Sequence, residues 1–193
     1  ELQVADFEDY ARCALGEKVI EVERITDEGG TVRAEIAVAL SQKAGFKALG
    51  LVNGIRCSSG THMRLVADQL ATGIAGLTMQ NQKEGLTTAN VRRHLKIVVK
   101  VWVDRPTFDS QTKSSLTSTA RRLGFDLELT TGFIRRAAEL GILDAAMKDV
   151  VRTSQRTLRS ATSSKISAAK LDDAVLAGKR KEPCTLILTE GDS

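Results

Sequence analysis

The sequence predicts an α+β fold in which helices cover one face of a mostly antiparallel sheet. Residues 19–25 and 31–40 are rich in β-branched residues, and the turn-forming segment 27–30 separates them, so they predict a hairpin. Residues 95–103 are almost wholly apolar, which is typical of a buried strand. Residues 61–76 repeat apolar side chains at helical spacing. Sheet-forming and helix-forming segments therefore share one core.

The remaining elements follow along the chain. Residues 31–40 alternate apolar and mostly polar side chains, so we expect this strand to be half-buried. Asp6 can cap a first helix that Gly16 ends. The other expected elements are a strand at 46–52, a short helix at 88–94, a polar loop at 106–113, helices at 131–140 and 143–160 broken near Gly141, and a strand at 185–189.

Composition limits the possible classes of protein. The 193 residues suit one domain with a connecting segment, or two small domains, and 42% hydrophobic residues suffice for a core. No apolar run is long enough for a bilayer and no signal-peptide pattern is present, so we expect no membrane partner. The three cysteines and two histidines are widely spaced, which predicts reduced thiols and no His/Cys metal cluster. Both ends of the chain suggest a piece of a larger protein.

Positive charge is concentrated in one part of the chain. The whole chain carries +4, whereas residues 148–181 hold nine basic and three acidic residues. Such asymmetry indicates a polyanionic partner. Within this region one helical face carries basic residues spaced four, four and three apart, namely Lys148, Arg152, Arg156 and Arg159. This stripe is either a solvated face or a DNA-binding one.

The sharpest motif is Glu190-Gly191-Asp192-Ser193, which directly follows the apolar strand at 185–189. A carboxylate fixed at the end of a strand can bind Mg²⁺, which prefers oxygen ligands. On residues alone, an ordinary acidic turn at the end of a strand is the favoured interpretation of this pattern. The string closely resembles the opening strand of the TOPRIM domain of type IIA DNA topoisomerases. That resemblance implies that Glu190 is a catalytic residue and a Mg²⁺ ligand.

A second motif lies in the loop at 106–113, which contains Gln111-Thr112-Lys113. Taken by itself, this is a solvated loop with one lysine. It resembles the family's Gln-Thr-Lys loop, which reaches into the nucleotide site of the neighbouring ATPase domain. The resemblance implies that Lys113 meets the γ-phosphate of ATP as a point charge, with Gln111 as its companion.

Two further segments resemble the same family. Residues 52–62 match the segment that joins a transducer strand to its main helix, although Ser59-Gly60 stands where the family has Gly-Gly before Thr-His. Residues 170–178 resemble the approach to the TOPRIM strand, more in the eukaryotic and phage manner than in that of bacterial gyrase. Several motifs in the family's order make a chance match improbable.

The resemblance implies a domain order. Residues 1–140 are expected to form a transducer domain of the ribosomal-protein-S5 domain 2-like fold. A long helix at 141–163 leads out of it, a linker follows at 164–183, and the TOPRIM domain starts at 184–193. The ATP pocket would lie in a preceding domain, and the cleavage tyrosine in a later one.

The function implied is that of one part of an ATP-dependent type IIA DNA topoisomerase, which passes one duplex through a transient double-strand break. This part would couple ATP binding and hydrolysis to the DNA gate, with Mg²⁺ and ATP as cofactors. The expected partners are double-stranded DNA, the preceding ATPase domain, the remainder of TOPRIM with the tyrosine-bearing cleavage domain, and further subunits in a homodimer or heterotetramer. The location would be the cytoplasm of a bacterial or phage-infected cell, or a eukaryotic nucleus.

We expect the isolated chain to be inactive. It contains no Gly-x-x-x-x-Gly-Lys loop, and its one tyrosine, Tyr10, lies in a predicted helix. Two other functions stay open: a free-standing nucleic-acid-binding module, and the transducer of a mismatch-repair or chaperone-type ATPase. Neither would be expected to end in Thr-Glu-Gly-Asp-Ser. An Asp-x-Asp pair some tens of residues beyond Ser193 would decide between them.

Overall fold

The computed structural model describes residues 4–79 and 86–162, without the side chains of 78–79 and 156–162. Contacts divide the chain into two compact units, residues 1–151 and residues 152–193. The fold described below belongs to the first unit; of the second, only the helical segment 152–162 is described. The predicted linker and final strand lie outside the described residues, so the predicted domain boundaries stay a prediction.

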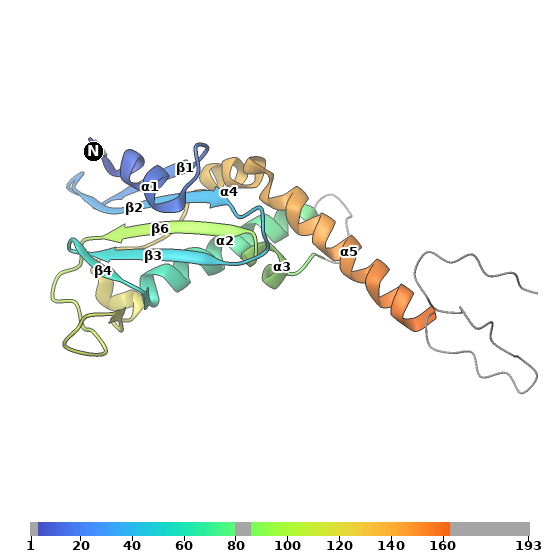
Figure 1. The fold of residues 1–193 in the computed structure, drawn as a ribbon. Helices are drawn as coiled ribbons and strands as arrows, with labels where there is room; N and C mark the ends of the chain where they lie inside the picture. Colours follow the sequence, from blue (N-terminus) through green and yellow to red (C-terminus); the bar gives the residue numbers. More distant parts are fainter. Residues whose placement is uncertain (1–3, 80–85, 163–193) are drawn as a thin grey trace, which may run out of the picture. The chain divides into compact units, whose positions relative to one another are not determined.

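A five-stranded sheet forms the centre of the first unit, with the order β1-β2-β6-β3-β4 (Figure 1). Its strands are β1 (Glu21–Thr26), β2 (Val32–Leu40), β3 (Lys47–Val52), β4 (Ile55–Cys57) and β6 (Leu95–Val101). All neighbouring pairs are antiparallel except β3 and β6, which are parallel. The predicted α+β class and mostly antiparallel sheet are therefore confirmed.

The first hairpin forms where the sequence predicts it. The Asp27 carboxylate accepts hydrogen bonds from the N–H groups of Gly29, at 3.0 Å, and Thr31, at 2.9 Å. Gly30 takes a left-handed φ of 78°, which a side chain would disfavour. Asp27 thus closes the turn and sets the register of β1 against β2.

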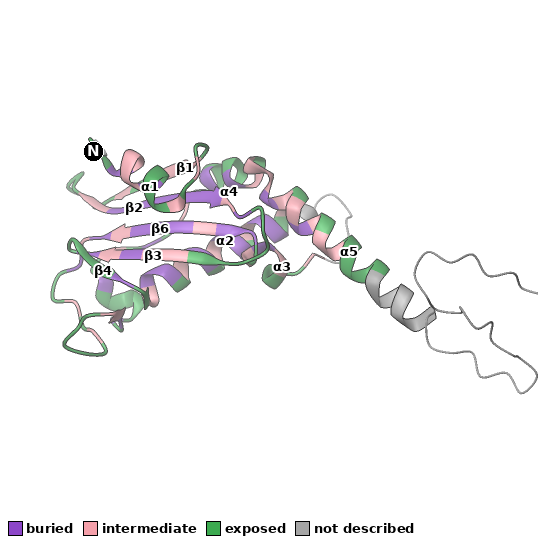
Figure 2. Ribbon diagram, viewed as in Figure 1, coloured by how far each residue is buried: buried purple, intermediate pink, exposed green. Residues whose placement is uncertain are grey.

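The main core lies between the sheet and the helices α2 (Thr61–Met79) and α4 (Thr131–Ala137). Fully buried aliphatic side chains from every second strand residue, such as Ile36, Ile97 and Val99, face this side. Phe133 of α4 is buried in the same cluster. Figure 2 shows buried residues running along both the central strands and α2. The helical spacing of residues 61–76 therefore marks the helix that covers the sheet.

The prediction that helices cover only one face is wrong. Helix α1 (Phe7–Leu15) packs on the opposite face, where Phe7 and Ala11 form a second cluster with Ala37 and Val98. For the same reason β2 is buried on both faces and not half-buried. The small side chain of Ala37 allows a helix to approach, and the apolar run in β6 supplies Val98.

The predicted helix ends agree with the structure. The Asp6 carboxylate caps α1 by accepting from the N–H of Asp9 at 2.9 Å, and Gly16 ends the helix with a φ of 65°. The short helix α3 (Thr88–Arg92) precedes β6. After α4, the π-helical segment η2 (Ala138–Ile142) contains Gly141 at a φ of 90°, and α5 (Leu143–Thr162) begins there.

Helix α5 is tied to the sheet near its start. The buried His94 imidazole places Nε2 3.1 Å from the Asp149 carboxylate of α5 and Nδ1 3.1 Å from the Ser41 carbonyl.

Within residues 4–79 and 86–162, no helix combines the length and apolarity that crossing a membrane would require.

Candidate functional site

The polar loop after β6 is folded as a two-armed finger, here defined as residues 106–117. The Thr117 N–H donates to the Thr107 carbonyl at 2.9 Å, and the Asp109 N–H donates to the Ser115 carbonyl at 3.1 Å. Phe108 and Leu116 form an antiparallel bridge between the arms. The arms therefore support each other, although the loop has almost no apolar core of its own.

The base of the finger is attached to the core. Ser118 is buried, and its hydroxyl accepts from the Thr107 N–H at 2.9 Å. The second arm contains β7 (Ser115–Leu116), which pairs in parallel with β5 (Ser59–Gly60) directly before α2. Leu116 itself is buried in the main core. The finger is thus joined directly to the sheet and to α2.

Asn53 fixes the place where the chain leaves β6. Its side-chain amide accepts from the Val103 N–H and donates to the Val103 carbonyl, both at 2.9 Å. Asn53 has a left-handed φ of 50° and forms, with Gly54, the two-residue turn between β3 and β4. Asparagine tolerates this conformation better than other side chains.

The tip of the finger, residues 110–114, has its backbone held from behind. The Lys113 N–H donates to the Ser110 carbonyl at 3.1 Å, which closes a tight turn. The Cys57 thiol donates to the Lys113 carbonyl at 3.3 Å, and the Ser58 N–H donates to the Ser114 carbonyl at 2.9 Å. Lys113 has a left-handed φ of 55°, an unfavourable conformation that these bonds maintain.

Burial, and secondarily the negative charge of Asp109, raise the pKa of the Cys57 thiol. The thiol therefore stays protonated at neutral pH and keeps the proton that it donates. Cys57 acts on the tip as a hydrogen-bond donor, and its buried position argues against a reactive thiolate.

The side chains that the sequence singles out at the tip are exposed. Gln111 and Lys113 are both exposed, and the described residues offer no carboxylate within ion-pair distance of the Lys113 ammonium. Lys113 Nζ lies 5.9 Å from the centre of the Phe108 ring, its nearest aromatic neighbour. The Asp109 carboxylate instead accepts from the Ser115 N–H at 3.0 Å. The tip therefore presents an ammonium and an amide that are available to a ligand.

Behind the finger, His62 fills a slot between Gly50 of β3 and Gly60 of β5. A Cβ added at Gly50 would overlap His62 Nε2, and one at Gly60 would come within 2.9 Å of Nδ1. Burial lowers the pKa of His62 to about 4, so its imidazole is neutral at physiological pH. Neither ring nitrogen has a hydrogen-bond partner among the described residues. His62 is thus a structural residue, as its isolation in the sequence predicts.

The other predicted site residues are not brought to the finger. Lys148 and Arg152 are exposed on α5, and the side chains of Arg156 and Arg159 are not described. Glu190 lies outside the described residues, so its metal role is not tested. Within the part of the chain that the structure describes, no three His, Cys, Asp or Glu side chains gather as a metal site would require.

Sequence reasoning missed the short strands β4, β5 and β7 and the residues that hold the finger. One local signal was available: Asn53-Gly54 between apolar residues is a strong indication of a two-residue hairpin turn. The support from Cys57 has no local signal, because it joins residues 56 positions apart.

Comparison with known proteins gives a consistent result. The sequence profile of the family described as DNA gyrase B matches residues 4–165. DNA topoisomerase 2-alpha of Gallus gallus is 35% identical over 204 residues, which covers 100% of this chain and 13% of that protein. Probable DNA topoisomerase 2 of Dictyostelium discoideum is 34% identical over 208 residues, with the same coverage. The chain thus spans only about an eighth of these relatives' length.

Solved structures agree with the sequence matches. The ATPase and transducer domains of DNA topoisomerase II from Balamuthia mandrillaris align with a TM-score of 0.63 and 27% identity, covering 70% of this chain and 34% of that one. The ATPase region of Saccharomyces cerevisiae topoisomerase II aligns with a TM-score of 0.65 and 24% identity, covering 78% and 38%. The second similarity concerns the fold alone.

Proposed function

The chain belongs to the DNA gyrase B family, and from this premise we propose that it is the transducer part of an ATP-dependent type IIA DNA topoisomerase. The whole enzyme would pass one DNA duplex through a transient break in another. This part would carry the state of a bound nucleotide to the DNA gate. Its S5-like fold over residues 1–140 would then connect a preceding ATPase domain with the cleavage machinery that follows.

The finger is the observation that carries the proposal. Its backbone is bonded on both arms and from behind, while the Lys113 ammonium at the tip has no carboxylate partner among the described residues. We propose that Lys113 contacts the γ-phosphate of ATP bound in the preceding domain and that Gln111 contacts the same nucleotide. A cation fixed in advance stabilises charge that develops on the transferred phosphoryl group.

Coupling would use the rigid path behind the finger. The second arm pairs with β5, which runs directly into α2. Helix α2 in turn packs against the sheet in the main core. The same sheet holds the start of α5 through His94 and Asp149. A displacement of the tip on nucleotide binding would therefore be transmitted to α5 through packed elements and not through a loose loop.

For the DNA gate, we propose that Glu190 is a catalytic residue and the first Mg²⁺ ligand of the TOPRIM domain. Support comes from the resemblance of Glu190-Gly191-Asp192-Ser193 to that family's motif. Mg²⁺ at such a site would offset charge at the reacting phosphodiester. The partners would be double-stranded DNA, the rest of TOPRIM, the tyrosine-bearing domain and a second copy of the enzyme, in a nucleus or a cytoplasm.

Glu190→Gln in the full-length enzyme tests this proposal. The substitution keeps the shape and removes the anionic ligand, so DNA cleavage and religation should be abolished or fall severely while ATP hydrolysis persists. Plasmid cleavage and ATP turnover are measured side by side, with Asp192→Asn as the milder matched variant. Normal cleavage by Glu190→Gln would refute the metal assignment.

The basic stripe on α5 is proposed to contact the phosphates of a transported duplex, without reading bases. Reversing Lys148 and Arg152 to Glu should weaken DNA binding and flatten its salt dependence, with no change in sequence preference. Arg121 and Arg122, two exposed arginines of the 3-10 helix η1 (Ala120–Leu123), reversed in the same way, serve as the control. If the salt dependence of DNA binding were unchanged in the α5 variant, the stripe would be interpreted as a solvated face and not as a DNA-binding one.

A further inference from the structure

One half of strand β3 has an unpaired edge. Strand β4 pairs only with Gly50–Val52, because after Cys57 the chain turns away and the Ser58 N–H donates to the Ser114 carbonyl. On the side away from β6, no strand within the described residues pairs with residues 47–49. We call residues 46–49 the open edge. An unpaired edge offers backbone groups to an additional strand.

The backbone direction at the open edge follows from its neighbours. The N–H groups of Gly45 and Asn53 both donate toward the β6 side, to Arg93 at 2.7 Å and to Val101 at 3.0 Å. Odd-numbered residues of this segment therefore face β6, and even-numbered ones face the other way. Ala48 is even-numbered, so its N–H and carbonyl point out of the open edge.

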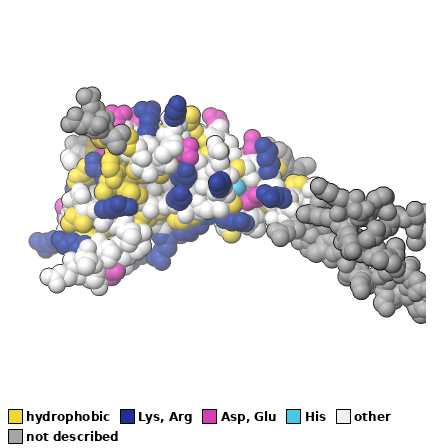
Figure 3. Space-filling model, viewed as in Figure 1, with side chains coloured by type: hydrophobic (Ala, Val, Ile, Leu, Met, Phe, Trp, Pro, Cys, Tyr) yellow, Lys and Arg dark blue, Asp and Glu magenta, His cyan; other side chains and the backbone are white. Residues whose placement is uncertain are grey.

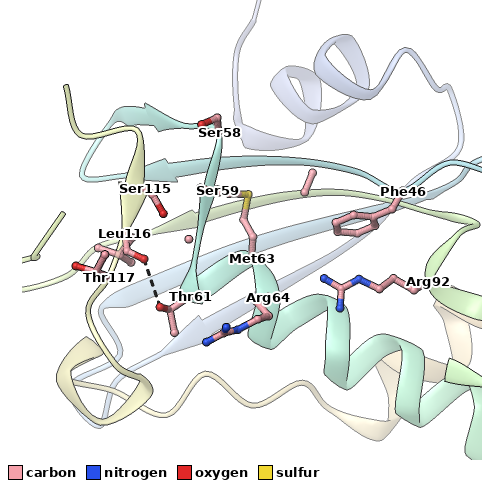
Figure 4. A pocket seen from close by; sticks show the side chains of 12 residues that line it. Phe46, Ser58, Ser59, Thr61, Met63, Arg64, Arg92, Ser115, Leu116 and Thr117 are labelled. Atoms are coloured by element: carbon pink, nitrogen blue, oxygen red, sulfur yellow. Dashed lines mark hydrogen bonds between the residues drawn. The ribbon is translucent and has the colours of Figure 1, made fainter. Parts of the chain in front are cut away.

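Two pockets flank the open edge, one on each face of the sheet. The first has a volume of about 520 Å³ and lies toward α2, where Met63 and Arg64 line it (Figure 4). The second has a volume of about 530 Å³ and lies toward α1, where Leu15 and Leu49 line it. Both pockets are lined by Phe46, Ala48 and Ser58. A strand added here would place successive side chains alternately into these two pockets.

The charged residues that line the two pockets are all positive. Their linings contain five basic residues and no acidic one: Arg64 and Arg92 in the first, and Lys47, Arg56 and Lys96 in the second. Arg92 pairs with Asp68 and Lys96 pairs with Glu17. For the other three, the described residues provide no ion-pair partner. Figure 3 shows basic side chains beside apolar ones on the face in view.

Phe46 supplies an apolar anchor between the two pockets. It is 36% exposed, and the Arg92 guanidinium lies 4.9 Å from its ring centre. Figure 4 shows the Phe46 ring and the Arg92 guanidinium facing each other at one end of the first pocket. One face of the ring is therefore occupied by a cation, which leaves it less available for stacking on a nucleic-acid base.

We propose that the open edge binds an extended acidic peptide of a partner protein, which adds as a strand beside β3. The Ala48 backbone groups would bond to the peptide backbone, and the two pockets would take its alternating side chains. The unpaired cations would select Asp and Glu in the peptide. A single-stranded nucleic acid fits less well, because it cannot continue a ladder of peptide hydrogen bonds. The second arm of the finger, at residues 115–117, lines the first pocket, but the tip at residues 110–114 lines neither pocket, so the proposal does not depend on the ATP contact.

The test uses the full chain and a synthetic seven-residue peptide in which Glu and Val alternate, blocked at both ends and labelled for fluorescence anisotropy. We expect saturable binding that weakens with salt. Hydrogen exchange at the Ala48 amide should slow when the peptide is bound, because that N–H gains an acceptor. Failure to bind, or binding with unchanged Ala48 exchange, would overturn the proposal.

Matched variants sharpen the test. Arg56→Glu combined with Arg64→Glu should weaken binding at least about tenfold, because two unpaired cations become repulsive. The control, Arg121→Glu combined with Arg122→Glu, should bind normally, and circular dichroism checks that both variants fold. A peptide with proline at its centre should bind far more weakly. Equal binding of the proline peptide, or stronger binding of an oligothymidylate of equal charge, would contradict strand addition.

Discussion

The His62 slot and the finger lie next to each other, yet different forces fix them. In the slot, Gly50 and Gly60 leave just enough space for a neutral imidazole, so excluded volume sets the geometry. In the finger, hydrogen bonds that Cys57 and Ser58 donate, and one that the Asp109 carboxylate accepts, hold an exposed tip. We therefore expect the scaffold behind the tip to tolerate few changes, whereas the tip side chains can change without loss of the fold.

The largest expected effect at neutral pH is at Gly50. Gly50→Ala places a Cβ against His62 Nε2, so the free energy of unfolding should fall by roughly 2 kcal/mol or more through overpacking. The matched control is Gly76→Ala in α2, where a Cβ meets nothing within 4 Å; it should leave stability equal or raise it by up to about 1 kcal/mol. Urea denaturation midpoints measure both. If Gly50→Ala were as stable as the parent, excluded volume would not fix the slot.

The next effect is a pH dependence that originates in the slot. Because burial lowers the pKa of His62 to about 4 from 6.5, the unfolded chain binds a proton at this residue more readily than the folded one. The contribution of neutral His62 to the free energy of unfolding is therefore fully present above pH 6.5. It declines as the pH falls toward 4, by roughly 3 kcal/mol in total. His62→Leu should flatten the stability profile over this window. Parallel profiles for parent and variant would show that His62 titrates normally.

The sequence predicts much of the scaffold because its signals are local. The turn at Asp27, the cap at Asp6 and the break at Gly141 each depend on residues within a few positions, and all three are confirmed. The first helix was predicted, but its place on the second face of the sheet was not, because residues 31–40 alternate apolar and polar side chains only if Ala37 is not counted as apolar. Pairing across the chain, as between β3 and β6, has no signal in a single sequence.

The candidate site was predictable only in part. Gln111 and Lys113 were selected by resemblance, since three polar residues in a loop do not by themselves predict a nucleotide contact. What the structure adds is their support: a left-handed Lys113 held by a buried thiol that is distant in the sequence. Such support depends on tertiary packing, which brings β4 beside the finger, and no periodic pattern encodes it.

The smallest expected effect on stability belongs to the tip, and it allows the most direct test. Lys113→Ala should change the free energy of unfolding by no more than about 0.5 kcal/mol, because the exposed side chain has no ion pair in the described part of the chain. The decisive measurement is the rate of ATP hydrolysis by the full-length enzyme carrying Lys113→Ala, beside the exposed-lysine control Lys43→Ala. The account predicts a fall of at least about tenfold for Lys113→Ala alone, with ATP-independent DNA cleavage intact. Unchanged ATP hydrolysis in Lys113→Ala, or a loss of cleavage in its place, would contradict it.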